Sequence, residues 1–179
     1  MNNGNRTGLN IAICGLGTVG GGTLALLQKN AEELRLRLGA ELKVTRIATR
    51  TLDPEKLSGI ENLSNDPLDA VNDESIDVVI ETIGGVDPAL EVIRQALVNG
   101  KHIVTANKAL IAEYGNELFQ LAQENNVTLA FESSVAGGIP IIKALREGLA
   151  ANKIDWLAGI INGTGNFIMS EMTSKKRKF

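Results

Sequence analysis

The 179-residue sequence predicts an α/β fold built on a doubly wound parallel sheet. Three observations predict it. Short apolar runs alternate with helical segments along most of the chain, which is the pattern of parallel strands joined by crossover helices. The run 76–83 is apolar almost throughout, as in a strand that is covered on both faces. The first apolar run ends in the glycine turn Gly15-x-Gly17-x-x-Gly20, from which an amphipathic helix starts.

The glycine turn has the spacing of a dinucleotide-binding site. Gly15 allows a tight turn out of the strand, Gly17 lets a pyrophosphate approach the backbone, and Gly20 lets the helix pack closely on the strand. The N–H groups of the first helical turn would then face the phosphates. Because a strand precedes the turn and a helix follows it, we predict a Rossmann-type domain. The alternative is a tight strand-to-helix turn in another kind of α/β protein.

The other elements follow in alternating order. The helix after the glycine turn carries apolar residues at helical spacing as far as Leu38, and a loop is expected at 51–65. Asp87 and Pro88 look like the N-cap and first position of a helix that ends at Asn99-Gly100. Further helices are expected at 66–72 and 109–125. Further strands are expected at 41–49, 76–83, 102–105 and 127–132.

The pattern divides the chain into a terminus and two domains. Residues 1–8 are polar and are expected to be disordered, and residues 9–136 form the Rossmann-type domain. Residues 137–179 are too few for a core of their own and are expected to begin a second domain that this chain does not complete. That part is predicted to hold a helix to about Asn152, a weak strand at 154–161, a loop at 162–166, a helix start at 167–172, and a solvated, disordered basic end at 175–178.

Composition narrows the function classes. The formal net charge is −3, so the composition shows no excess of basic residues that would indicate nucleic-acid binding. The sequence contains no window of eighteen apolar residues, so a membrane span is not expected. The single cysteine, Cys14, cannot form an intrachain disulfide, which fits a cytoplasmic location. Cys14 lies inside the first strand, where we expect a buried, inert thiol.

Ligands of open parallel sheets bind beyond the carboxyl ends of the strands, and this rule sorts the candidate residues. His102 begins its strand and lies at the opposite edge, so a surface role is expected. Arg50 follows the second strand where NAD-specific sites usually have an acid, and an arginine there can meet the 2′-phosphate of NADP. The alternative is that Arg50 is simply solvated.

Three more features are expected at this carboxyl edge. Thr82 lies at the end of the strand 76–83, just before the turn that ends at Gly85. Lys108 starts a helix, where its ammonium could hold an oxyanion or exchange a proton beside a reacting carbonyl. Glu132 could hold a hard cation together with backbone carbonyls, or could simply cap the next helix.

Taken together, these motifs resemble the homoserine dehydrogenase family. The matching stretches are Gly15-Leu-Gly-Thr-Val-Gly-Gly-Gly22, Glu81-Thr-Ile-Gly-Gly85, Gly100-Lys-His-Ile-Val-Thr-Ala-Asn-Lys-Ala-Leu-Ile111, Phe131-Glu-Ser-Ser-Val-Ala-Gly-Gly-Ile-Pro-Ile-Ile142 and Gly159-Ile-Ile-Asn-Gly-Thr164. The family interconverts L-homoserine and L-aspartate 4-semialdehyde with NAD(P), in the synthesis of threonine, methionine and isoleucine. The resemblance therefore implies an oxidoreductase with small-molecule substrates, of the monofunctional type. It also implies that residues 137–179 are the first, incomplete part of the family's α+β catalytic and dimerisation domain.

The resemblance also implies roles for individual residues. It puts cofactor contacts at Leu16, Thr18 and Val19, with Arg50 near the adenosine phosphate, and it places Lys108 between cofactor and substrate as the catalytic residue. With the glycine turn and Thr82, these make up the expected NADP site, in which NAD remains possible. A sodium ion is implied at Glu132, Val135, Gly137 and Ile139.

Two departures from the family pattern qualify these expectations. Gly165 stands where the family usually has Thr or Ser, and family members continue for well over a hundred further residues, as homodimers or homotetramers. We therefore expect a truncated chain that binds NADP(H) weakly and has little turnover alone. A non-catalytic NAD(P)-sensing module is the alternative. A semialdehyde dehydrogenase is disfavoured because its thiol must be accessible, and Cys14 lies within a strand.

Overall fold

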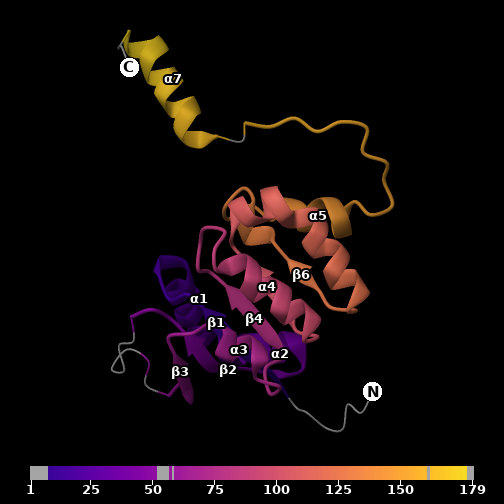
Figure 1. Cartoon of the computed structure of the whole chain (residues 1–179). Helices are drawn as coiled ribbons and strands as arrows, with labels where there is room; N and C mark the ends of the chain where they lie inside the picture. Colours follow the sequence, from indigo (N-terminus) through magenta and orange to yellow (C-terminus); the bar gives the residue numbers. More distant parts are fainter. Residues whose placement is uncertain (1–7, 52–56, 58, 161, 177–179) are drawn as a thin grey trace. The chain divides into compact units, whose positions relative to one another are not determined.

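The computed structural model of the chain describes residues 8–51, 57, 59–160 and 162–176 (Figure 1). The chain divides into two compact units, 1–138 and 139–179, where the sequence predicted a boundary after residue 136. The first unit holds a six-stranded parallel sheet in the order β3-β2-β1-β4-β5-β6. The strands are β1 (Gly8–Cys14), β2 (Glu41–Ala48), β3 (Asn62–Ser64), β4 (Val78–Glu81), β5 (His102–Thr105) and β6 (Leu129–Ala130). This is the strand order of dinucleotide-binding folds, so the Rossmann-type doubly wound parallel sheet is confirmed.

Helices cover both faces of this sheet because alternate residues of each strand point to opposite sides. On β1, Ile11 and Ile13 belong to one apolar cluster with Leu24 of α1. Ala12 and Cys14 belong to the other cluster, whose helical members come from α3, α4 and α5. The helices are α1 (Thr18–Lys29), α3 (Leu68–Asn72), α4 (Ala89–Val98) and α5 (Lys108–Glu124).

Several sequence expectations for the first unit were wrong in detail. The predicted loop at 51–65 contains the edge strand β3, which is too short to show a periodic pattern. The helix predicted to run to Leu38 breaks at Asn30 into α1 and α2 (Ala31–Leu38). The helix α4 has Pro88 as its N-cap residue, so Asp87 does not cap it. The strand predicted at 127–132 keeps only the two residues of β6.

The expected disorder of residues 1–8 falls mostly outside the described residues, but Gly8 itself is the first residue of β1. Its backbone pairs with Glu41 of β2. A Cβ at this position would lie 2.8 Å from the Glu41 carbonyl oxygen. Gly8 is therefore part of the sheet, and its lack of a side chain allows the close approach to the Glu41 backbone.

The second unit is helical wherever it is regular. A short helical segment comprises α6 (Ile141–Lys143) and a π-helical turn, η2 (Ala144–Gly148), and ends before the predicted limit near Asn152. The strand predicted at 154–161 is absent from 154–160, and residue 161 lies outside the described part of the chain. A single strand with no neighbour to pair with is not stable.

The predicted loop at 162–166 is instead the start of α7 (Gly163–Lys175). The side-chain oxygen of Asn162 accepts a hydrogen bond from the Gly165 N–H at 2.8 Å, which makes Asn162 a regular N-cap. Of the predicted basic end, Lys175 closes α7 and Lys176 is its C-cap, and the rest lies outside the described residues.

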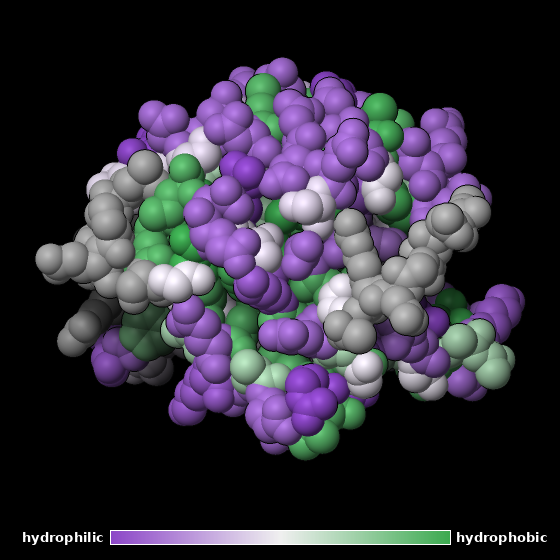
Figure 2. Space-filling model, turned by 90° about the horizontal axis from the view of Figure 1, so that it is seen from below, coloured by the Kyte–Doolittle hydropathy of each residue, from purple (hydrophilic) through white to green (hydrophobic). Residues whose placement is uncertain are grey.

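The described residues contain no helix with the length and apolar character needed to span a bilayer. On the face drawn in Figure 2, hydrophilic side chains predominate, and hydrophobic ones lie in smaller patches among them.

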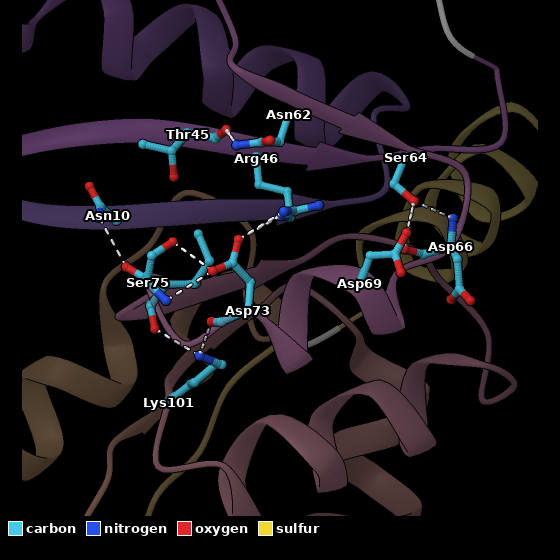
Figure 3. A network of polar contacts seen from close by, with 11 residues as sticks. Asn10, Thr45, Arg46, Asn62, Ser64, Asp66, Asp69, Asp73, Ser75 and Lys101 are labelled. Atoms are coloured by element: carbon cyan, nitrogen blue, oxygen red, sulfur yellow. Dashed lines mark hydrogen bonds and ion pairs between the residues drawn. The ribbon is translucent and has the colours of Figure 1, made fainter.

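A polar network joins the strands at the amino edge of the sheet (Figure 3). One carboxylate oxygen of Asp73 accepts from the guanidinium of Arg46 at 2.8 and 3.0 Å. The other accepts from the hydroxyl and the N–H of Ser75 at 2.6 and 2.9 Å. The buried ammonium of Lys101 donates to the carbonyl oxygens of Asp73 and Ile76 at 2.5 and 2.9 Å. The network therefore ties β2, the turn before β4, and the start of β5 together.

Asp73 should make the stability of the fold depend on acid. The pKa of Asp73 is lowered to about 2, chiefly by the hydrogen bonds that its carboxylate accepts from Ser75 and further by the Arg46 guanidinium. Because the folded-state pKa lies below the usual 3.8, this stabilisation is present above about pH 4 and is lost as the pH falls toward 2. We expect Asp73→Asn to lower the free energy of unfolding by about 2 kcal/mol at neutral pH and by less near pH 3.

Urea denaturation at both pH values measures this difference. Glu74→Gln, at the exposed neighbouring position, is the control and should change stability little. An Asp73→Asn variant that loses the same free energy at both pH values would contradict the assignment.

Gly20 of α1 lies against the glycine turn that precedes it. A Cβ built on Gly20 would lie 2.0 Å from the Gly15 carbonyl oxygen and 2.7 Å from the Thr82 hydroxyl. Since both neighbours are held in place, we expect Gly20→Ala to lower the free energy of unfolding by about 2–3 kcal/mol. Gly22, in the same helix, has open space where a Cβ would lie, and Gly22→Ala should raise stability by about 0.5–1 kcal/mol. Urea denaturation of both variants tests the predicted opposite signs, and equal effects would refute the packing argument.

Candidate functional site

A groove with a volume of about 460 Å³ lies at the carboxyl edge of the sheet, where β1 and β4 are neighbours. This is the point at which the strand order reverses, the usual ligand site of doubly wound sheets. Loops after β1, β2 and β4 line it. The lining residues are Gly15, Leu16, Gly17, Ala48, Thr49, Arg50, Thr51, Asn65, Pro67, Thr82, Ile83, Gly84, Asp87 and Pro88. The groove thus brings together five of the residues predicted from sequence: Gly15, Leu16, Gly17, Arg50 and Thr82.

The N-terminus of α1 opens beside this groove with no acidic side chain near it. Gly17 is the N-cap residue and provides no side-chain cap, and the first turn of α1 contains no acid. Thr18 and Val19, in that turn, are exposed, and Gly20 is buried against the strand. Backbone N–H groups at the positive end of a helix dipole are well suited to bind an anion such as a pyrophosphate.

The glycine turn is held by hydrogen bonds to the end of β2 and to the residue that follows β4. The Gly15 N–H donates to the Ala48 carbonyl oxygen at 2.8 Å, and the Thr82 hydroxyl donates to the Gly15 carbonyl oxygen at 2.6 Å. Gly15 has φ +94°, and a Cβ there would lie 2.6 Å from the Thr82 carbonyl oxygen. The predicted role of Gly15 therefore has two physical reasons, its positive φ and the closeness of the turn after β4.

Two charged residues of opposite sign lie on the groove. Arg50 follows β2 and is exposed there, as expected for a residue that meets a phosphate at the adenosine end. Asp87 lies on the other side of the groove, in the loop between β4 and α4, and is also exposed. The sequence reading treated Asp87 only as a helix cap, and its place on the groove follows from the fold.

Lys108 is the first residue of α5 and has an exposed side chain. It is not among the residues that line the groove. Its backbone position is set by Asn107, a buried N-cap whose side chain accepts from the Leu110 N–H at 3.2 Å. The sequence reading missed Asn107, although an asparagine directly before a helical pattern is a typical capping signal.

The end of β4 carries a buried acid, Glu81, for which the sequence predicted no role. The pKa of the Cys14 thiol is raised to about 12, mainly because the thiol is buried and also because the charge of Glu81 is close to it. The Cys14 thiol is therefore protonated and inert, as expected from its place in β1.

The residues expected to hold sodium lie at the boundary between the units. Glu132 begins the short 3₁₀ helix η1 (Glu132–Ser134), and its carbonyl oxygen accepts from the Val135 N–H at 3.2 Å. Val135 is extended and Gly137 is exposed, and both belong with Glu132 to the first unit. Ile139 belongs to the second unit. Within the described residues, no group of three or more His, Cys, Asp or Glu side chains could hold a metal ion, so a cation here would need backbone carbonyl oxygens as ligands.

His102 lies at the amino edge, as predicted, and its Nδ1 accepts from the Thr128 N–H at 3.1 Å. It lines a second groove, of about 930 Å³, together with Glu74, Asp77 and Lys101. This groove is the larger of the two, but it lies at the edge where doubly wound sheets do not bind their cofactors. Function is therefore assigned to the carboxyl-edge groove on the basis of its position and donors.

Comparison with known proteins agrees with this geometry. The family model described as homoserine dehydrogenase, NAD binding domain, matches residues 15–132, and the model described as homoserine dehydrogenase matches residues 140–179. The homoserine dehydrogenase of Pseudomonas aeruginosa is 56% identical over 169 residues, which are 94% of this chain and 39% of that protein. The chain thus spans about 40% of the length of the curated relatives it matches.

Solved structures show the same similarity. A homoserine dehydrogenase from Thiobacillus denitrificans superposes with a TM-score of 0.87 at 57% identity, over 96% of this chain and 41% of that one. A hyperthermophilic archaeal homoserine dehydrogenase in complex with NADPH superposes with a TM-score of 0.66 at 34% identity, over 80% of this chain and 49% of that one. The chain belongs to the homoserine dehydrogenase family.

Proposed function

We propose that this chain supplies the NADP-binding part of an enzyme that interconverts L-homoserine and L-aspartate 4-semialdehyde. The observation that carries the proposal is the groove at the reversal of strand order, which combines a glycine turn, an uncapped helix N-terminus and an arginine. When bound, the nicotinamide ring accepts or returns the hydride of the reaction. The residues of this chain bind and orient that cofactor.

The pyrophosphate of the cofactor would lie at Gly17, Thr18 and Val19. Gly17 has open space where a Cβ would be, so phosphate oxygens can approach its backbone. The N–H groups of the first turn of α1 point toward the same place. The closed packing of Gly15 and Gly20 on Thr82 keeps this turn in the required conformation.

A preference for NADP over NAD rests on Arg50. A guanidinium at the end of β2 can form paired hydrogen bonds with a 2′-phosphate. The archaeal relative in complex with NADPH supports this choice by similarity. The exposed position of Arg50 also leaves its donors accessible to a ligand.

Lys108 is proposed as the catalytic residue that faces the oxygen of the reacting carbon. Its ammonium would stabilise charge on that oxygen or move its proton. Its exposure at the carboxyl edge, at the start of α5, is compatible with contact to a bound substrate. The rest of the substrate site is proposed to lie in the part of the relatives' sequence that this chain does not span.

A sodium ion at Glu132, Val135, Gly137 and Ile139 is a further part of the proposal. A carboxylate and backbone carbonyl oxygens are the donors that hard cations prefer, so the donor set fits chemically. The proposal also includes a cytoplasmic location and a homodimer or homotetramer for the protein of family length. The low cysteine content supports the first.

The role of Arg50 predicts how cofactor affinity changes on substitution. We expect Arg50→Ala to weaken NADPH binding by about tenfold, since one charge-assisted phosphate contact is lost, and to leave NADH binding nearly unchanged. Fluorescence titration of the purified 179-residue chain with each nucleotide measures both affinities. Arg37→Ala, on α2 and paired with Glu33, is the matched control. An equal loss for NADPH and NADH would rule out recognition of the 2′-phosphate.

Turnover tests the proposed reaction and the role of Lys108. A chain extended to family length should reduce NADP in the presence of L-homoserine, and Lys108→Ala should lower its kcat by about 10²–10⁴ while it weakens NADPH binding much less. Lys29→Ala, at the end of α1, is the control. Nucleotide binding without homoserine-dependent turnover in the extended wild type would instead favour the non-catalytic sensing module.

A further inference from the structure

Glu81 is a fully buried acid at the carboxyl end of β4, next to the reversal of strand order. Burying a carboxylate costs free energy unless donors surround it. Within the described part of the chain it is the one fully buried acid, and no salt bridge there pairs it with a cation. The buried carboxylate is therefore stabilised by neutral hydrogen-bond donors. The segments that supply these donors are the ones that Glu81 holds in place.

The two carboxylate oxygens of Glu81 contact two different segments. One oxygen accepts from the Ile83 N–H at 2.8 Å and from the Gly84 N–H at 3.4 Å, which are in the loop after β4. The other accepts from the Thr105 hydroxyl at 2.5 Å, at the end of β5. A single side chain thus connects the loop after β4 with the end of the adjacent strand β5.

Thr105 passes this connection on to the start of α5. Its hydroxyl gives its only hydrogen to Glu81, so its lone pairs are left to accept, and they accept from the Asn107 N–H at 3.0 Å. The Asn107 side chain then donates to the Gly85 carbonyl oxygen at 2.5 Å and accepts from the Leu110 N–H. The contacts close a ring from Glu81 through Thr105 and Asn107 to the loop 82–85.

This ring lies on one side of the groove only. Arg50, after β2, serves the adenosine end, and β4 and β5 lie on the other side of β1 in the sheet. In a doubly wound sheet the second nucleotide half lies over the strands beyond the reversal of order. The loops held by Glu81 therefore face the nicotinamide half, and the helix they anchor begins at Lys108.

We propose that Glu81 is a positioning residue, which acts through Thr105 and Asn107 to fix the loop 82–85 and the start of α5 around the nicotinamide half of the cofactor. This inference rests on the proposed function, because it takes the groove to be the NADP site. It predicts an effect restricted to that half. A general loss of stability would instead weaken the binding of every part of the cofactor.

Titration of the 179-residue chain with NADPH and with adenosine 2′,5′-bisphosphate, which lacks the nicotinamide half, separates these cases. Glu81→Gln should weaken NADPH binding by about tenfold and change binding of the bisphosphate by less than about twofold. Glu91→Gln, an exposed acid of α4, is the matched control. An equal loss for both ligands, or no loss for either, overturns the proposal.

Thr105 variants keep the test decisive if Glu81→Gln does not fold. Thr105→Val removes the hydroxyl and should reproduce the selective loss of NADPH affinity. Thr105→Ser keeps a hydroxyl and should bind NADPH as the wild type does. Hydrogen exchange at the Leu110 amide adds a readout without ligand, and it should be faster in Glu81→Gln and Thr105→Val than in the wild type. Unchanged exchange in both variants overturns the inference even if NADPH binds. A wild-type chain that binds neither nucleotide instead overturns the proposed function.

Discussion

The close approach of the glycine turn to the start of the loop after β4 is the constraint on which the rest of the site depends. Gly15 and Gly20 have no room for a side chain because the Thr82 backbone and hydroxyl lie against them. The Thr82 hydroxyl in turn donates to the Gly15 carbonyl oxygen at 2.6 Å. This contact brings the N-terminus of α1 to the edge of β4, and residues of both segments line the carboxyl-edge groove.

The two edges of the sheet use buried charge differently. At the amino edge, Arg46 pairs with Asp73, and the Lys101 ammonium donates to backbone carbonyls, so these charges hold strands together. At the carboxyl edge, Glu81 is buried among neutral donors from two loops, while Arg50 and Lys108 remain exposed. Exposed cations and a rigid backbone at one edge suit the binding of a phosphorylated ligand. At the amino edge the charges hold strands together, so the larger groove there is not proposed as the site of a phosphorylated ligand.

The sequence alone predicted the parallel sheet and the glycine turn after its first strand, because long apolar runs and glycine spacing are local signals. It did not predict β3, whose three residues form a strand only by pairing with Arg46, Ile47 and Ala48. The ring around Glu81 was also missed, because hydrogen bonds between residues 81 and 105 depend on strands that become neighbours only in the fold. The strand expected at 154–161 follows an apolar local pattern, but 154–160 is not a strand, and the described part of the second unit contains no strand with which it could pair.

The assignment of the cofactor to the carboxyl-edge groove can be tested by following the backbone amide resonances of the ¹⁵N-labelled chain as NADPH is added. Shifts should concentrate at 15–20, at Arg50 and at 82–85, while 100–102 in the amino-edge groove stay unchanged. Shifts centred on 100–102, with the glycine turn unaffected, would contradict the account.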